Sequence, residues 1–408
     1  MAEVGTGLRA RDAEVVDATD TIVMPGFVDT HRHALTSLFR NLGESAPETL
    51  PQALADHHRP EDVYAATLIG LLGAVEAGIT TVVDWSELPA DGEFVDAALQ
   101  AHADAGLRTV FVHSMPPATG WGTTAAAARG LLTRLGEAAG PSTTIAMGTS
   151  DLGSAGTGGD PSPWAIVREL GRPLHVHAPP PAARPGAIAE LAGRGLVGDD
   201  VTFVHCSGLE GADLDAIAAS RASVSLAPAS EMAGGLGPPP IQQLVDRDIR
   251  PGLGVDDERV APGDLFAQMR AIISLQHATA FDLKLAGKAG VPRLMNTRDV
   301  IRFATADGAR VAGLRGVCGS LEPGMQADLI VLRADRPNIF PINDPIGAVV
   351  WGMDTSNVDW VFVGGRVLMR EGVLQADVQR ARDLATAAHR RVAAASGLVV
   401  GAAAGGEA

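Results

Sequence analysis

The sequence predicts an α/β protein, a TIM-type (β/α)8 barrel with a small β-sandwich domain built from both chain termini. Eight short apolar segments alternate with stretches of helical periodicity over residues 23–254, which indicates parallel strands with helices between them. The chain of 408 residues has room for a barrel of roughly 250 to 300 residues and a smaller satellite. An open doubly wound sheet is the rival fold, but the Gly-rich phosphate turn that usually follows its first strand is missing here.

The predicted barrel elements follow one another in a regular order. The strands are residues 26–30, 80–84, 108–113, 144–148, 173–177, 202–205, 223–226 and 250–254. The helices between them include residues 61–77, 93–105, 125–139, 187–194 and 214–220. Strands that alternate with helices pair in parallel, and eight of them close economically into a barrel.

The pattern changes after residue 256. Residues 265–277 and 297–312 have helical periodicity, and then short antiparallel strands are expected at residues 327–332, 358–363 and 366–369, with Gly364-Gly365 as a hairpin turn. Residues 14–23 can supply one more strand from the other chain end. We therefore expect three parts: residues 1–25 plus 321–375 form the β-sandwich, 26–320 the barrel, and 376–408 a C-terminal helix with an Ala/Gly-rich tail.

Composition excludes several classes of protein. A formal net charge of −16 would repel a phosphate backbone, so nucleic acid is not an expected partner. The chain has no apolar run of about 20 residues and its start lacks the apolar core of a secretory signal, so we expect no membrane partner and a cytoplasmic location. The two cysteines are too few for a disulfide framework. A small molecule is the expected substrate.

Histidines mark the ends of several predicted strands. His31 and His33 end the first strand, and alternation of side chains along a strand points them the same way. His177 ends the fifth strand, His205 the sixth, and Asp256 follows the eighth. Active sites of this barrel collect at the carboxyl ends of strands, where side chains from different strands converge. Imidazoles with one carboxylate predict a divalent metal, Zn²⁺ first and Fe²⁺ or Mn²⁺ as alternatives, that lowers the pKa of a bound water.

These motifs resemble the amidohydrolase superfamily, in particular its cytosine deaminase, guanine deaminase and chlorohydrolase-like branch. The resemblance rests on MPGFVDTHRH, AGITTVVDW, HVHA, TFVHC, GSLEPGMQADLIVL and VFVGGRV, and it spans about residues 15–372. It implies one metal ion held by His31, His33, His177 and Asp256, with His205 contacting the metal-activated hydroxide or the substrate. It also implies a homo-oligomer, commonly a homodimer. Many relatives bridge two metals with a carboxylated lysine on the fourth strand, but this chain has no lysine before Lys284.

The sequence also departs from that branch. Deaminases of this kind usually carry His-x-x-Glu at the fifth strand, whereas this chain reads His177-Ala178-Pro179-Pro180. Where the branch often has Pro-Thr-Ser-Asn after the seventh strand, this chain ends the motif with Glu231, which could replace the missing acid or be a solvated residue of a flexible loop. Relatives also usually carry more strands before the Pro-Gly-Phe-Val-Asp segment, so either the sandwich is reduced or the true start lies upstream.

The residues assign roles and a reaction class. Asp256 is the predicted proton shuttle, His205 is expected to steady developing negative charge, and Glu231 completes the catalytic set. His113 and Asp84 end other strands and are candidate substrate contacts together with His205 and Glu231. We expect hydrolysis of a non-peptide C–N bond, most simply deamination of a small nitrogen heterocycle. The alternatives are displacement of chloride or alkylamine from such a ring, or a non-hydrolytic lyase or cyclase reaction.

Overall fold

A computed structural model describes residues 1–8, 13–42, 57–88, 92–115, 125–150, 152, 163–178 and 185–397. Pro179-Pro180, where the sequence lacks the expected acid, and the tail from residue 398 onward lie outside these residues.

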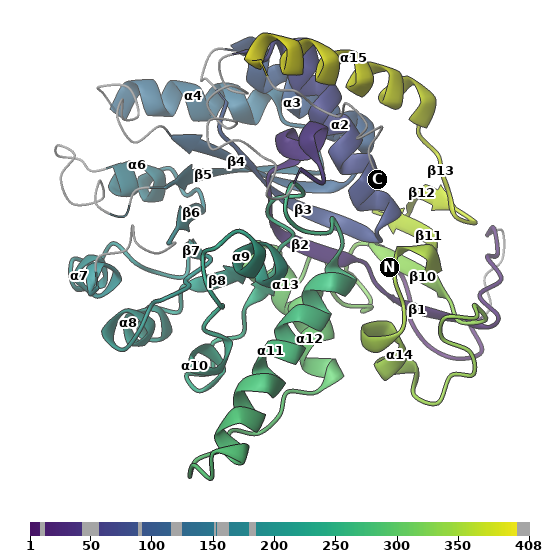
Figure 1. The fold of residues 1–408 in the computed structure, drawn as a ribbon. Helices are drawn as coiled ribbons and strands as arrows, with labels where there is room; N and C mark the ends of the chain where they lie inside the picture. Colours follow the sequence, from purple (N-terminus) through teal and green to yellow (C-terminus); the bar gives the residue numbers. More distant parts are fainter. Residues whose placement is uncertain are drawn as a thin grey trace, which may run out of the picture.

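Eight parallel strands form the barrel (Figure 1). They are β2 (Phe27–Arg32), β3 (Ile79–Ser86), β4 (Arg108–Met115), β5 (Thr143–Thr149), β6 (Leu174–His177), β7 (Val201–Val204), β8 (Ser223–Leu226) and β9 (Gly252–Leu253). Each pairs with the next in chain order. The ring closes where β9 runs on beside β2: Asp256 donates its backbone N–H to the His31 carbonyl at 2.8 Å and accepts from the His33 N–H at 3.0 Å. The predicted barrel is confirmed, with strand bounds shifted by no more than two residues.

Helices surround the ring and follow the strands in sequence (Figure 1). They are α2 (Pro60–Glu76), α3 (Gly92–Ala105), α4 (Ala125–Ala138), α6 (Pro163–Glu169), α7 (Ala187–Gly193), α8 (Ala212–Ser220), α9 (Pro228–Ala233), α10 (Ile241–Val245), α11 (Leu265–Leu285), α12 (Thr297–Phe303), α13 (Ala306–Val311), α14 (Pro345–Trp351) and α15 (Val378–Ser396), with the short 3-10 turns η1 (Ala34–Phe39) and η3 (Thr355–Asn357). The single helix expected at residues 297–312 is two, because Thr305 leaves helical geometry at φ −134° and ψ −96°. In the part of the chain that is described, no helix is long and apolar enough to span a membrane.

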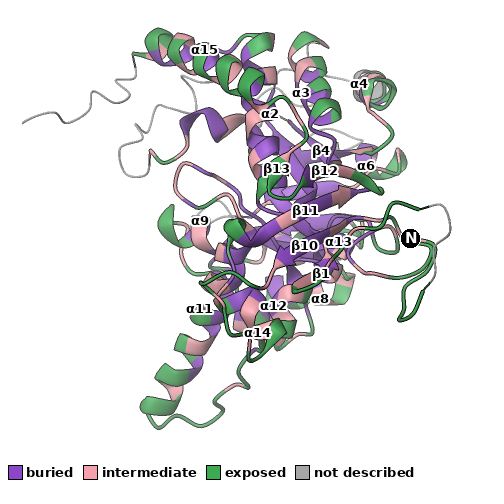
Figure 2. Cartoon of the chain, turned by 90° about the vertical axis from the view of Figure 1, so that its right-hand side faces the viewer, coloured by how far each residue is buried: buried purple, intermediate pink, exposed green. Residues whose placement is uncertain are grey.

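The strands bury both of their faces. One set of side chains, including Val83 and Val112, packs inside the ring, where Ala309 of α13 joins it. The alternate set, including Phe111 and Val176, packs outward against the helices. Figure 2 shows this buried centre with exposed residues gathered on the outer helices. A strand buried on both faces reads as a continuous apolar run, which is why composition alone does not tell its two faces apart.

A second sheet joins the two chain ends, as expected (Figure 1). It contains β1 (Thr21–Pro25), β10 (Leu329–Arg333), β11 (Val358–Val363), β12 (Arg366–Arg370) and β13 (Val373–Leu374), all antiparallel. Among the described residues it is one five-stranded layer. The sequence predicts that residues 14–23 supply this strand, but the strand begins only at Thr21, so residues 14–20 lie outside it. Arg108 of β4 forms a two-point ion pair with Asp328, at 2.7 and 3.2 Å, and so fastens this sheet to the barrel.

Candidate metal centre

The centre is built around the two histidines of β2. His31 is fully buried and His33 is partly exposed, and each directs Nε2 to the same carboxylate oxygen, Asp256 Oδ1, at 3.3 and 3.4 Å. The pairing of β2 with β3 shifts register between Asp29 and Arg32, so regular alternation is interrupted within the motif. The two rings nevertheless converge on one point, as the His-x-His spacing predicts.

Asp256 is held at the seam of the barrel. Its backbone adopts a left-handed conformation with φ 64°, three residues after the end of β9, and its other carboxylate oxygen accepts from Ser230 Oγ at 2.6 Å. Gly254 allows the close approach of the two strands, since a Cβ there would lie 2.7 Å from the His31 carbonyl oxygen. Although burial acts to raise it, the hydrogen bonds from His31 and His33 hold the pKa of Asp256 well below its usual 3.8. The carboxylate is therefore ionised.

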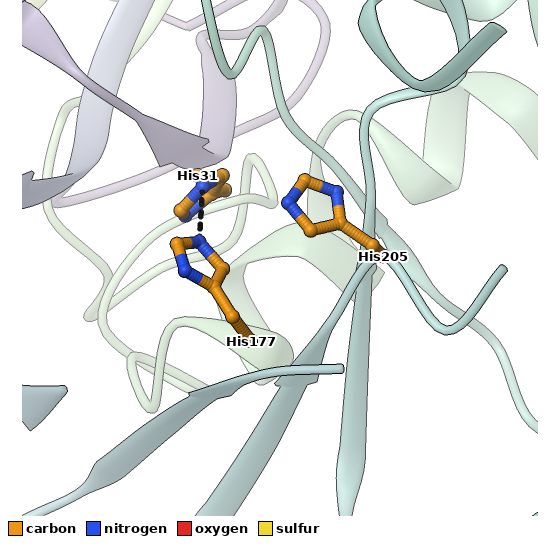
Figure 3. Close-up of side chains that lie close together, drawn as sticks. All are labelled: His31, His177 and His205. Carbon is orange, nitrogen blue, oxygen red and sulfur yellow. Dashed lines mark hydrogen bonds between the residues drawn. The ribbon is translucent and has the colours of Figure 1, made fainter. Parts of the chain in front are cut away.

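His177 and His205 complete the cluster from the other side of the ring (Figure 3). His177 ends β6 and places Nε2 3.1 Å from Nε2 of His31. His205 follows β7, and its positive φ of 75° departs from ordinary strand geometry. Its Nδ1 lies toward Glu231, and its other ring nitrogen lies toward the other two histidines. One potential ligand atom from each of His31, His177 and His205 lies within 4.8 Å of the others, and the same holds for His31, His33 and Asp256.

The distances fit a single small cation. Ligand bonds of about 2.0 to 2.1 Å in tetrahedral geometry set neighbouring ligand atoms about 3.3 Å apart. The separations here are 3.1 Å between His31 and His177, 3.3 Å between His31 and Asp256, and 3.4 Å between His33 and Asp256. Burial lowers the pKa of His31 to about 4, so its ring is neutral near pH 7 and its lone pair is available to a metal. His31 is common to the group that contains His177 and to the group that contains His33 and Asp256, so these residues suit the binding of a divalent ion beside His31.

A buried ion network fastens β2 to the segment that carries Asp256. Arg32, between the two histidines, donates to Asp29 at 2.7 Å and to the Gly263 carbonyl at 2.9 Å, and its guanidinium lies 3.3 Å from Glu258. Glu258 also pairs with Arg40 at 3.0 Å. Burial opposes ionisation of Glu258, but Arg32 and Arg40 keep its pKa below the usual value. Because Glu258 lies two residues after Asp256, these contacts fix the carboxylate relative to both histidines.

Glu231 lies behind His205 and is fully buried in α9. Its Oε1 accepts from the Ala227 N–H at 2.8 Å and lies 3.2 Å from His205 Nδ1. Burial raises the pKa of Glu231, and its Oε2 has no hydrogen-bond partner among the residues described. The flexible-loop reading of this glutamate was wrong. Its position favours action through His205.

Trp85 is a site residue that the sequence reading missed. It lies in the interior of the ring, and its indole stacks on His177 with the ring centres 3.9 Å apart. Its Nε1 donates to Glu87 at 3.1 Å. Ser230 and Arg32 were missed as well. Because β3 is buried on both faces, its sequence does not show that Trp85 faces inward, and the contacts of Ser230 and Arg32 are long-range.

Two predicted substrate contacts face the wrong way. Asp84 lies between the inward residues Val83 and Trp85, so it points outward; its oxygens accept from the Ala34 N–H at 2.9 Å and lie 2.8 Å from His102 Nε2. His113 follows inward Val112 by one residue and lies on the helix side of β4. Both were selected because they end strands. Alternation turns them away from the mouth, which corrects those two assignments.

The sequence profile of the amidohydrolase family matches residues 22–151 and 165–368. A 5'-deoxyadenosine deaminase of Methanothermobacter thermautotrophicus is 26% identical over 404 aligned positions, covering 92% of this chain and 88% of that protein. A 5-methylthioadenosine/S-adenosylhomocysteine deaminase of Desulfitobacterium hafniense is 28% identical over 395 positions, covering 90% and 85%.

Solved structures share the fold. A zinc-bound adenosine deaminase from Xanthomonas campestris superposes with a TM-score of 0.75 at 21% identity, covering 92% of this chain and 87% of that one. The atrazine chlorohydrolase TrzN from Arthrobacter aurescens, complexed with zinc, gives a TM-score of 0.78 at 21% identity and covers 95% and 93%. At this identity the superpositions establish the architecture.

Proposed function

The chain belongs to the amidohydrolase family, and on that premise we propose that it is a metal-dependent aminohydrolase of a small nitrogen heterocycle. The observation that carries the proposal is the spacing of three pairs of ligand atoms, His31 with His177 and Asp256 with each of His31 and His33, which matches the spacing of ligands to one cation. Zn²⁺ is the proposed ion, since imidazole and carboxylate ligands suit it, with Fe²⁺ and Mn²⁺ next. Relatives named for deamination of 5'-deoxyadenosine and 5-methylthioadenosine support amino-substituted purines as the first substrates to test.

One ion accounts for the ligand set. Many binuclear relatives bridge their two metals with a carboxylated lysine on the fourth strand, and the lysines of this chain are Lys284 and Lys288, far beyond β5. When bound, a divalent ion supplies a hydroxide nucleophile near neutral pH by lowering the pKa of water. The remaining chemistry falls to the protein side chains.

Asp256 is the residue placed to accept and return a proton. Its Oδ1 lies at the centre of the cluster, while Ser230 holds Oδ2 and so fixes the plane of the carboxylate. A general base must lie within hydrogen-bond reach of the proton that it takes, and the carboxylate of Asp256 is directed into the cluster as this condition requires. Asp256 would pass that proton to the departing amine.

His205 and Glu231 act together in this proposal. Glu231 accepts from Nδ1–H of His205 and thereby directs Nε2 into the cluster. Burial acts to lower the pKa of His205, but Glu231 and Asp256 raise it overall. A protonated His205 can donate to negative charge that develops on the substrate or to its ring nitrogen. The pair thus supplies a donor in a chain whose fifth strand ends in His177-Ala178-Pro179-Pro180.

The same sequence feature favours a second candidate. Proline has no proton to give, so a reaction that does not need protonation of a ring nitrogen by the fifth-strand acid fits this chain too. Displacement of chloride or an alkylamine from an activated ring is such a reaction. A lyase or cyclase reaction is the remaining alternative, because it would use the cluster without incorporating water.

Metal analysis and product analysis separate these proposals. Protein as purified is assayed for metal by inductively coupled plasma mass spectrometry, then screened for ammonia release over purine nucleosides, pyrimidines, pterins and triazines. We expect about one ion per chain, ammonia from an amino-substituted ring, and one ¹⁸O atom in the product formed in labelled water. Chloride or amine release assigns the second candidate, and product without the label assigns the third. Active protein without metal would overturn all of them.

A further inference from the structure

The end of α11 and the segment after it, residues 281–294, project from the body of the protein; we call them the α11 arm (Figure 1). Within it, all residues are exposed except Leu283 and Pro292, which are half-buried. Figure 2 shows the same exposed tip from the side. The first half of α11 packs on its neighbours, with Phe266, Met269 and Ile273 buried. The helix is therefore anchored at one end and free at the other.

An apolar stripe runs along this helix. Phe281 and Leu285 are one turn apart on the same face and are 45% and 85% exposed. The ring of His277, one turn earlier, lies 6.2 Å from the Phe281 ring and 6.5 Å from the ring of Trp351 on α14, which is 50% exposed. Single exposed apolar residues are ordinary, whereas a continuous row of large ones indicates an interaction surface.

Charge changes sign along the stripe. The arm carries Lys284, Lys288 and Arg293 against Asp282 alone, although the whole chain has a net charge of −16. At the other end, Asp344 begins α14 and Asp354 follows it, and both are exposed. The stripe is thus positive at the free tip and negative near the body.

We propose that two copies of this chain associate through their α11 arms, packed antiparallel about a twofold axis. Antiparallel packing lays one apolar stripe on the other, and it brings the tip cations of each copy to the body-end carboxylates of its partner. A self-complementary surface of this kind is what a twofold interface requires, because the same patch serves both subunits. In this arrangement two strongly acidic chains meet with unlike charges facing each other. An anionic membrane would match the cations but would repel Asp344 and Asp354.

The mass in solution tests the interface. Sedimentation velocity of the metal-loaded protein at about 20 µM should give twice 41.9 kDa. Replacing Phe281 and Leu285 with Glu together should give a monomer, with dimerisation weakened at least 100-fold. Val373→Glu, at an equally exposed apolar position on β13, should stay dimeric. Unchanged circular dichroism and metal content show that the arm variant is folded. A monomeric wild type, or an arm variant that stays dimeric, would overturn the proposal.

A mixing experiment tests the charge pattern. Lys284→Glu with Lys288→Glu places carboxylates at both tips of a homodimer, and Asp344→Lys with Asp354→Lys places cations at both body ends, so each variant alone should dimerise at least 10-fold more weakly. Mixed together, the two variants should form a heterodimer with every charge pair restored. Failure of the mixture to associate excludes the antiparallel arrangement. A wild type that is monomeric and sediments with vesicles of phosphatidylcholine and phosphatidylserine assigns the arm to a membrane instead.

Discussion

The two sides of the metal centre are held by different forces. The ligands from β2 and β9 are fixed by a charged network, in which Arg32 and Glu258 tie the histidine strand to the aspartate segment. On the opposite side, His177 stacks on Trp85, and His205 depends on Glu231. The first side has three of the four ligands that the family resemblance implies, and His177 on the second side is the fourth. The second side is where this sequence departs from the branch, at Pro179-Pro180 and at Glu231.

This contrast separates two tasks. Buried charges hold their partners rigidly only while every member of the network is paired, so the β2–β9 side is suited to fixing a cation. On the other side, His205 contacts Glu231, and a change at that pair alters the donor without altering the cation ligands. We infer that the β2–β9 side mainly sets cation affinity and that His205 and Glu231 mainly set the reaction type.

The largest effect is expected at Asp256, which is proposed both to bind the cation and to accept the proton. Asp256→Asn removes a charged ligand and the proton acceptor at once, so turnover should fall about 1000-fold or more and bound metal should drop. Both are measured on the same preparation, by steady-state kinetics and mass spectrometry. Asp257→Asn is the matched control, because that neighbouring carboxylate pairs with Arg259. Equal losses in the two variants would contradict the assignment.

Glu231→Gln tests the reaction side alone. The amide keeps the shape but not the charge, so His205 loses its ion-pair partner, and turnover should fall on the order of 100-fold while metal affinity is unchanged. The pH–rate profile should also move, since the raised pKa of His205 depends on Glu231. Glu322→Gln, at an exposed position, should match the wild type. Loss of metal from Glu231→Gln would show that Glu231 also supports cation binding, and would refute the assignment of cation affinity and reaction type to different sides of the centre.

Glu258→Gln is the converse test on the cation side. Arg32 and Arg40 lose their shared carboxylate, so the metal dissociation constant should rise about 30-fold, as for other residues that orient ligands. Turnover at saturating metal should stay within a few-fold of the wild type. Titration with a chelator of known affinity gives the first quantity, and assays in excess Zn²⁺ the second. A turnover defect that excess metal does not restore would count against the division.

The smallest expected effect is on the pH dependence of folding stability, through His113, which lies outside the metal centre. Burial, with a contribution from Arg134, lowers the pKa of His113 to about 4 from 6.5. Between these values the unfolded chain takes up a proton that the folded protein does not, so folding stability is lost as pH falls from 6.5 toward 4. At pH 5.5 the loss is on the order of 1 kcal/mol. Urea unfolding of metal-free wild type and His113→Gln at pH 7.5 and 5.5 should show a smaller pH dependence in the variant.

Sequence reasoning found what local pattern determines. Alternation, strand order and the rule that barrel sites form at carboxyl ends located His31, His33, His177, His205 and Asp256, and the structure brings all five together. The same rules misplaced Asp84 and His113, because strands apolar on both faces do not show which residues face inward. Ser230 and Arg32 could not be assigned, since their partners lie 26 and 226 residues away along the chain.

The seam between the first and last barrel strands also constrains biosynthesis. The Val255 N–H bonds to the Asp29 carboxylate across 226 residues of chain, and Asp256 follows immediately. At elongation rates of about 5 to 20 residues per second, Asp256 is synthesised roughly ten to fifty seconds after the β2 histidines. A nascent or truncated chain thus holds an ion only weakly. We therefore expect tight binding of the ion only after the whole barrel has been synthesised and β9 has paired with β2.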